Sequence, residues 1–95
     1  MRGTGRGAHT IYLRPTGELV VDWYDFGEDA PYESANMIVM TAKQQVALAR
    51  TLGLALGGPA ELARTIADRF NSYFAVRAYL DAKKLPYDHE VDFEV

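Results

Sequence analysis

The stretch His9-Thr-Ile-Tyr-Leu-Arg-Pro-Thr-Gly-Glu-Leu-Val-Val-Asp-Trp-Tyr-Asp-Phe26 predicts a β-hairpin, and with it an antiparallel sheet. Side chains alternate in the period of a strand along residues 9–14, and residues 18–26 are rich in Val, Trp, Tyr and Phe. Between them, Arg14-Pro-Thr-Gly17 has proline second and glycine fourth, as a type I turn prefers. The second strand should carry Leu19, Val21 and Trp23 on one face and Val20, Asp22, Tyr24 and Phe26 on the other.

Two more strands and three helices are expected after the hairpin. Residues 35–40 are apolar on both faces, which is typical of a central strand in a covered sheet. Residues 87–95 alternate throughout, with Tyr87, His89, Val91, Phe93 and Val95 inward and acids outward. The order β-β-β-α-α-α-β predicts an α+β domain in which an antiparallel sheet of about four strands has helices packed on one face.

The expected helices are bounded by recognisable capping residues. Thr41 with Gln44 has the spacing of a capping box, and it begins a helix over residues 42–52 that buries Val46, Ala49 and Leu52. Gly53 should end that helix in the left-handed conformation. Pro59 is suited to the first position of the next helix, and Ser72 should cap a third that runs through Lys84.

The length and composition indicate one small domain. The chain has 95 residues, so residues 9–95 are expected to form a single core, with the basic residues 1–8 as a disordered tail. The absence of cysteine excludes disulfides and thiolate metal sites. The basic start is followed by no apolar run, so we expect neither a signal peptide nor a membrane span, and a cytoplasmic location.

Charge is segregated along the sequence. Residues 15–42 carry six acids and no base, and residues 85–95 carry four acids and no base. Basic residues gather in the predicted helices and in the first fourteen residues. The net charge of −3 argues against general affinity for nucleic acid, which depends on neutralising phosphates.

The segment between residues 22 and 33 is both acidic and aromatic, and it is the predicted binding surface for a protein partner. Aromatic rings bury a large area at a small entropic cost, and carboxylates steer a basic partner. In the simpler alternative Trp23 belongs to the core and the acids form a solvated rim, and both descriptions can hold together. The predicted partner-binding residues are Tyr24, Asp25, Phe26, Glu28, Asp29, Tyr32 and Glu33.

Neither a metal site nor an active site is expected. The twelve residues from Asp22 to Glu33 have the outline of a calcium loop, but Tyr24 and Phe26 stand where ligands are required. The two histidines, His9 and His89, both fall at inward strand positions typical of structural histidines. Because no catalytic motif is present, the sequence predicts a protein that is not an enzyme and needs no cofactor.

The sequence leaves two other functions open. Residues 45–70 suggest a helix-turn-helix, in which Arg64, Arg69 and Arg77 would bind phosphate, but the second helix opens with no side chain suited to base edges. Simple helix packing is preferred, and a DNA-binding regulator is kept as an alternative. The outer acids of the last strand could also imitate nucleic acid phosphates, although a solvated edge is the simpler explanation; they are Asp88, Glu90, Asp92 and Glu94.

A resemblance to a known family is strongest over residues 19–41. It rests on a segment that lies after the hairpin and before an apolar strand, Trp23-Tyr-Asp-Phe-Gly-Glu-Asp-Ala-Pro-Tyr-Glu-Ser-Ala-Asn36. The chain resembles small bacterial immunity proteins of contact-dependent or polymorphic toxin systems, which are short, acidic and α+β. The resemblance implies stoichiometric binding that blocks a toxin, with a basic toxin or nuclease domain as the partner. A homodimer through the open sheet edge is also compatible with the sequence.

Overall fold

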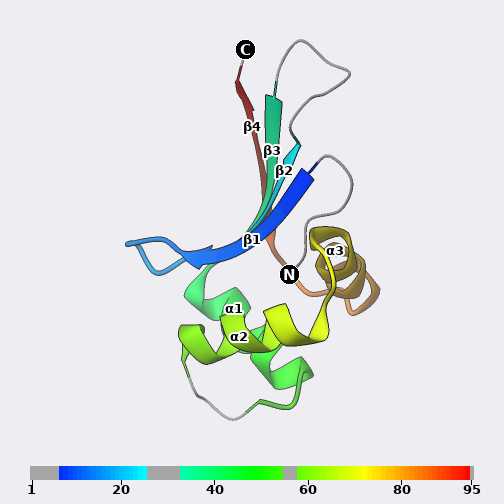
Figure 1. Ribbon diagram of the computed structural model, residues 1–95. Coiled ribbons are helices and arrows are strands. Elements are labelled where there is room, and N and C mark those ends of the chain that lie inside the picture. Colours follow the sequence, from blue (N-terminus) through cyan, green and yellow to red (C-terminus); the bar gives the residue numbers. More distant parts are fainter. Residues whose placement is uncertain (1–6, 26–32, 55–57, 95) are drawn as a thin grey trace.

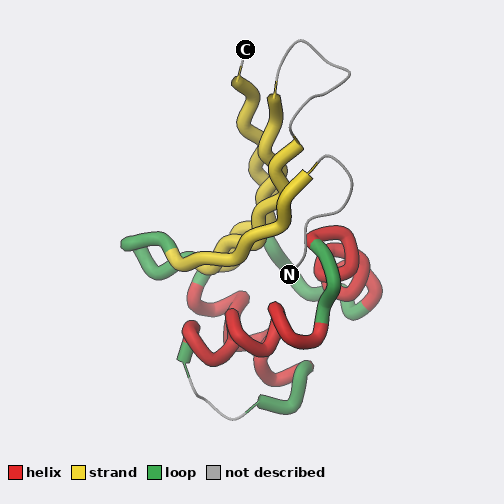
Figure 2. Tube along the Cα trace, viewed as in Figure 1, coloured by secondary structure: helices red, strands yellow, loops and turns green. Residues whose placement is uncertain are grey.

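The fold is an antiparallel sheet with three helices on one face, as the sequence predicts (Figures 1 and 2). The structure is a computed structural model, and it describes residues 7–25, 33–54 and 58–94. The elements in chain order are β1 (Gly7–Leu13), β2 (Leu19–Asp25), β3 (Glu33–Met40), α1 (Ala42–Thr51), α2 (Pro59–Arg69), α3 (Tyr73–Ala82) and β4 (Asp88–Glu94). The first strand therefore takes in Gly7 and Ala8, which were expected in the tail, and residues 1–6 lie outside the described part.

The four strands are arranged in the order β1-β2-β3-β4, and every neighbouring pair is antiparallel. β3 therefore lies inside the sheet, as its apolar faces predicted, while β1 and β4 are the edge strands. Figure 1 shows the strands rising beyond the helices, so that one end of the sheet projects past the helical layer.

The turn between β1 and β2 is tight and depends on a glycine. The Gly17 amide donates to the Arg14 carbonyl at 2.9 Å, and the Arg14 amide donates to the Glu18 carbonyl at 2.9 Å. Gly17 has a φ of 93°, a conformation that other residues adopt only at a cost. A turn followed by a left-handed glycine is a common three-residue hairpin connection, and it fixes the register of the first two strands.

The helix ends match the capping signals in the sequence. Thr41 and Gln44 form both hydrogen bonds of a capping box, and the Ser72 hydroxyl accepts from the Ala75 amide at 3.2 Å. Gly53 has a φ of 75°, and the next amide, that of Leu54, donates to the Ala49 carbonyl at 2.9 Å. The last helix is two residues shorter than expected.

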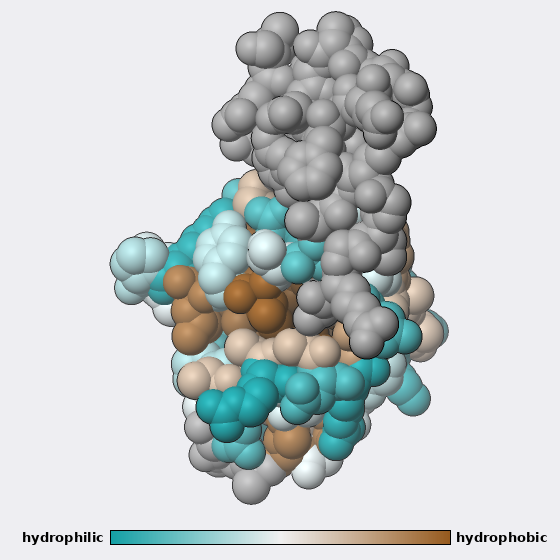
Figure 3. Space-filling view, viewed as in Figure 1, coloured by the Kyte–Doolittle hydropathy of each residue, from teal (hydrophilic) through white to brown (hydrophobic). Residues whose placement is uncertain are grey.

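The core lies between the sheet and the helices. Figure 3 shows a band of apolar surface between β1 and the helices on the face in view. The buried side chains of this core come from the helix-facing positions of β2 and β3 and from all three helices: Leu19, Val21, Ile38, Met40, Leu48, Leu52, Leu62, Ile66, Tyr73, Val76 and Leu80. Trp23 packs against this core, so the simpler expectation for that residue is confirmed.

In α1 the polar side chain of Gln45 is buried, whereas that of its neighbour Val46 is exposed. Val46, predicted to be buried, is 37% exposed, whereas Gln45 is 6% exposed. The Gln45 side-chain amide donates to the carbonyl oxygens of Met40 and Gly17, both at 2.9 Å. A glutamine is tolerated here because these two acceptors replace water.

The inward face of β4 is less buried than its alternation predicted. His89 is exposed and Val91 is 43% exposed, so the expectation of a structural histidine at residue 89 is wrong. β4 is an edge strand, and the sheet extends past the helices that would have covered it (Figure 1). Alternation identifies a face of a strand but not whether another layer reaches it.

His9, in contrast, is a buried structural histidine as expected. Its Nδ1 accepts a hydrogen bond of 2.9 Å from the Tyr73 amide at the start of α3. Its ring also lies against Phe74, with the ring centroids 5.9 Å apart. This hydrogen bond requires an unprotonated Nδ1, and burial lowers the pKa of His9 below its ordinary value of 6.5.

The lowered pKa predicts a loss of stability in mild acid. The unfolded chain binds a proton at His9 more readily than the folded protein, so stability is complete above pH 6.5 and falls as the pH drops through the folded pKa. His9→Asn keeps an acceptor for the Tyr73 amide but cannot titrate. In the wild type, the free energy of unfolding should fall by about 1 kcal/mol, the value of one hydrogen bond, between pH 7.5 and pH 5. In this variant that decrease should be absent, and urea titrations at the two pH values measure it. His89→Asn is the matched control, and equal acid sensitivity in both variants would contradict this role for His9.

Candidate functional site

The face of the sheet opposite the helices, here called the helix-free face, combines two buried valines with exposed polar groups. Cross-strand pairing places eight of its residues in two adjacent rows. The first row consists of Tyr12, Val20, Val39 and Asp88. The second consists of Thr10, Asp22, Met37 and Glu90.

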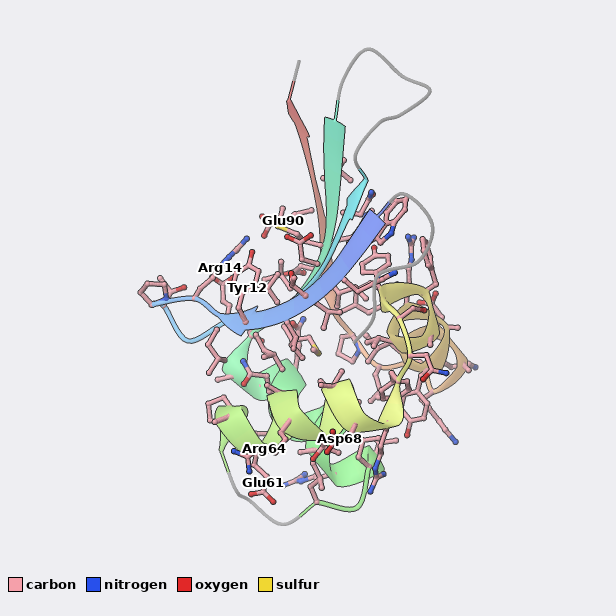
Figure 4. The ribbon with its side chains drawn as sticks, viewed as in Figure 1. Tyr12, Arg14, Glu61, Arg64, Asp68 and Glu90 are labelled. Carbon is pink, nitrogen blue, oxygen red and sulfur yellow. The ribbon has the colours of Figure 1, made fainter. Side chains whose placement is uncertain are left out.

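An arginine spans this face from one edge strand to the other. Arg14, directly after β1, donates from Nη1 to Glu90 Oε2 at 3.3 Å and from Nη2 to Glu90 Oε1 at 3.2 Å. The same Nη2 lies 3.9 Å from the sulfur of Met37, and the Tyr12 hydroxyl lies 3.8 Å from that sulfur. Figure 4 shows Tyr12, Arg14 and Glu90 together on the side of β1 away from the helices. The paired hydrogen bonds to Glu90 raise the pKa of Arg14.

This bridge explains how two valines are buried where no helix covers them. Val20 and Val39 are both 0% exposed, yet neither belongs to the core beneath the helices. To reach Glu90 in the second row, the Arg14 side chain must cross the first row, which contains both valines. Long side chains can cover apolar surface with their methylene groups while the charged end stays near water. The Arg14–Glu90 bridge therefore covers part of this face and shields the two valines from water.

Asp22, in the second row of this face, has no hydrogen-bond partner among the described residues. Its Oδ1 is buried and accepts no hydrogen bond, and burial raises the pKa of the carboxyl. Its neighbours in the row are Thr10 and Met37, and the guanidinium of Arg14 donates to Glu90. A buried polar atom without a partner costs stability, and such atoms are often found where a ligand or a partner binds.

The described part of the helix-free face is acidic and partly aromatic. Asp22, Asp88 and Glu90 supply three carboxylates, and among the described residues of this face Arg14 is the one base. Tyr12 is 41% exposed on the same face. These are the properties that the sequence predicted for the segment that follows Asp22, and they extend over neighbouring strands.

Three of the predicted partner-binding residues, Tyr24, Asp25 and Glu33, belong to the described strands. Tyr24 pairs with Ala8 and Ala35 two positions beyond Asp22, and Asp25 is the last residue of β2. Glu33 begins β3 and pairs with Glu94, which places two acidic residues opposite each other. The remaining predicted residues, Phe26, Glu28, Asp29 and Tyr32, lie outside the described residues.

The described residues show no arrangement suited to metal-dependent chemistry. Across residues 7–25, 33–54 and 58–94, no three His, Asp or Glu side chains are placed to hold a metal ion. His9 is engaged with α3, and His89 lies on the opposite face of β4 from the acids. No helix in the described part of the chain is both long and apolar enough to span a bilayer.

The sequence did not reveal the roles of Tyr12, Arg14 and Met37. Each has an ordinary place in a strand or turn, and the partner that gives Arg14 its role is Glu90, 76 residues away. The signal that was present is an acid in the middle of an apolar strand, Asp22 between Val21 and Trp23. The carboxylate of such an acid is exposed to water, paired with a donor or a cation, or buried without a partner. Only the tertiary structure decides which of these holds.

Comparison with protein family models, with curated proteins and with solved structures finds no match to this chain. Its function is therefore inferred from the helix-free face itself.

The unpartnered carboxyl of Asp22 predicts a variant that is more stable than the natural protein. Because the folded pKa is raised above 3.8, the wild type loses stability as the pH rises through the folded pKa and is constant above it. Asp22→Asn removes the charge, so we expect the free energy of unfolding to rise near pH 7 and to stay unchanged near pH 3. The gain should be at most about 1 kcal/mol, because the carboxyl is only partly buried and solvent screens the rest.

The exposed Asp88→Asn on the same face is the control, with an expected change within about 0.5 kcal/mol. Chemical denaturation at both pH values measures the difference. A destabilised Asp22→Asn at neutral pH would show that the carboxylate is satisfied in solution.

Proposed function

We propose that the protein is a non-enzymatic binding protein, of the immunity or inhibitor type, whose helix-free face and projecting sheet end bind a basic protein partner. The observation that carries this proposal is the buried Oδ1 of Asp22, which has no hydrogen-bond partner among the described residues and lies on an acidic face. A partner's lysine or arginine placed against Asp22 would supply the missing hydrogen bond and the missing charge.

The charges around Asp22 favour a cation over other ligands. Asp88 and Glu90 lie on the same face, and Arg14 is already held by Glu90 through two hydrogen bonds. The like charges of these carboxylates repel one another unless a cation lies between them. A basic partner relieves this repulsion, and the same charges speed its approach at low salt.

Aromatic residues supply the apolar part of the proposed interface. Tyr12 is exposed on the helix-free face. Tyr24 follows Asp22 by two positions in β2, and Phe26 and Tyr32 come later in the sequence. Interfaces are typically centred on tyrosine and tryptophan anchors within a polar rim. The resemblance to immunity proteins favours a toxin as the partner.

The contacts of the helices count against the DNA-binding alternative. The Arg69 guanidinium donates to the Leu52 carbonyl at 3.1 Å, where it ties α2 to the end of α1. Tyr87 and Tyr73 raise the pKa of Arg77, mainly through a hydrogen bond with Tyr87. Of the three arginines considered for phosphate binding, Arg64 alone has no such structural contact, and Glu61 lies one turn before it on α2 (Figure 4).

The proposal predicts that aromatic anchors can be removed without unfolding the protein. We expect Tyr24→Ala combined with Tyr32→Ala to weaken partner binding at least about 100-fold, since two anchor residues typically contribute about 2 kcal/mol or more each. The partner is first isolated from the native host with the tagged protein or co-expressed from the adjacent reading frame. Affinity is then measured by calorimetry at two salt concentrations, with circular dichroism to verify the fold. Unchanged affinity would remove these residues from the interface.

Two further variants separate binding from stability. Asp22→Asn should weaken partner binding about tenfold while it stabilises the free protein, and a merely structural role could not produce these opposite effects. Arg64→Ala, on the exposed side of α2, should leave partner binding unchanged. Salt-dependent DNA binding that disappears in Arg64→Ala would favour the regulator instead.

A further inference from the structure

A second candidate site lies on the helical side of the molecule, away from the helix-free face. It is a cleft of about 500 Å³ between α1, the beginning of α2 and the β1–β2 turn. Its apolar walls are formed by Ala42, Val46, Ala49, Leu54, Pro59 and Leu62. Pockets of about 300–1,000 Å³ with mostly apolar walls and few polar groups are typical of small-molecule sites.

One buried polar side chain, that of Gln45, lines the cleft and is 6% exposed. Both hydrogens of its side-chain amide are engaged, one with the Gly17 carbonyl and one with the Met40 carbonyl, each at 2.9 Å. Because both partners can only accept, the nitrogen must lie on their side and the oxygen on the other. The orientation of the amide is therefore fixed by the sheet turn and the end of β3.

The oxygen of this amide accepts no hydrogen bond from any described residue. It is not among the fully enclosed unsatisfied atoms, and it belongs to a side chain that lines the cleft. An immobilised acceptor in an apolar wall selects for a ligand that brings a donor. The one charged residue among the described lining residues is Glu61, which disfavours anions.

We propose that this cleft is a binding site for a small, uncharged, apolar molecule that carries one N–H or O–H donor directed at Gln45 Oε1. The apolar walls supply affinity in proportion to the area they bury, and the fixed acceptor supplies orientation. The exposure of Val46, which the helical pattern placed in the core, follows from its position on the wall of this cleft. The site is independent of the proposed partner interface, which lies on the other face of the sheet.

A matched pair of probes tests the role of the acceptor. Indole presents an N–H from a flat apolar body, and benzofuran has nearly the same shape with an oxygen in its place. For ligands of this size we expect a dissociation constant on the order of 1 mM for indole. Benzofuran should bind about fivefold more weakly, because it brings no donor to Gln45. Titrations followed by ¹⁵N NMR should shift the Gln45 side-chain amide together with the backbone amides of Val46, Ala49 and Leu62.

A pair of variants tests the location without disturbing Gln45. Val46→Trp places a large side chain on the exposed wall of the cleft and should abolish the indole shifts. Ala78→Trp adds the same group at an exposed position of α3 outside the cleft, and it should bind indole as the wild type does. Thermal denaturation of both variants verifies that they are folded.

Three results would overturn the proposal. Indole could fail to shift the cleft amides, or bind equally well to Val46→Trp. Equal affinity for indole and benzofuran would show that Gln45 Oε1 selects nothing. None of these results would affect the proposed partner interface, because the Asp22 and tyrosine variants test that face separately.

Discussion

Val20 and Val39 are fully buried on a face of the sheet that carries no helix, and the character of that face depends on this constraint. Strands that are apolar on both sides need cover on both sides, and the three helices of the described residues all lie on one side. The second cover is the Arg14 side chain, which reaches across the sheet to Glu90 on the far edge strand. One hydrogen-bonded pair thus joins the two edges of the sheet and shields its central valines.

The same face carries the group on which the proposed function rests. One oxygen of Asp22 is buried there without a hydrogen-bond partner among the described residues, while the Arg14 guanidinium donates to Glu90. The face has a desolvated carboxylate, further acids at its rim and an exposed tyrosine, Tyr12. The proposed function uses these carboxylates to accept a cation from the partner.

Much of the fold follows from short-range sequence patterns. The capping box at Thr41, the left-handed Gly53 and the Ser72 cap were each identified from a few adjacent residues, because the hydrogen bonds they make are local. The errors occurred where burial depended on a second layer. His89 and Val46 have the correct periodicity for a core, but His89 belongs to a sheet edge that no helix reaches and Val46 faces a cleft.

Local sequence signals were enough to establish the element order, the antiparallel hairpin, the central position of β3 and the concentration of acids beside aromatic residues. They could not identify which polar groups would be buried, since each finds or lacks its partner through distant contacts. His9 meets the Tyr73 amide 64 residues away, Gln45 meets the Gly17 carbonyl 28 residues away, and Asp22 meets no partner. The free energy of a buried polar group depends on the atoms packed around it, and those atoms are brought together only when the chain folds.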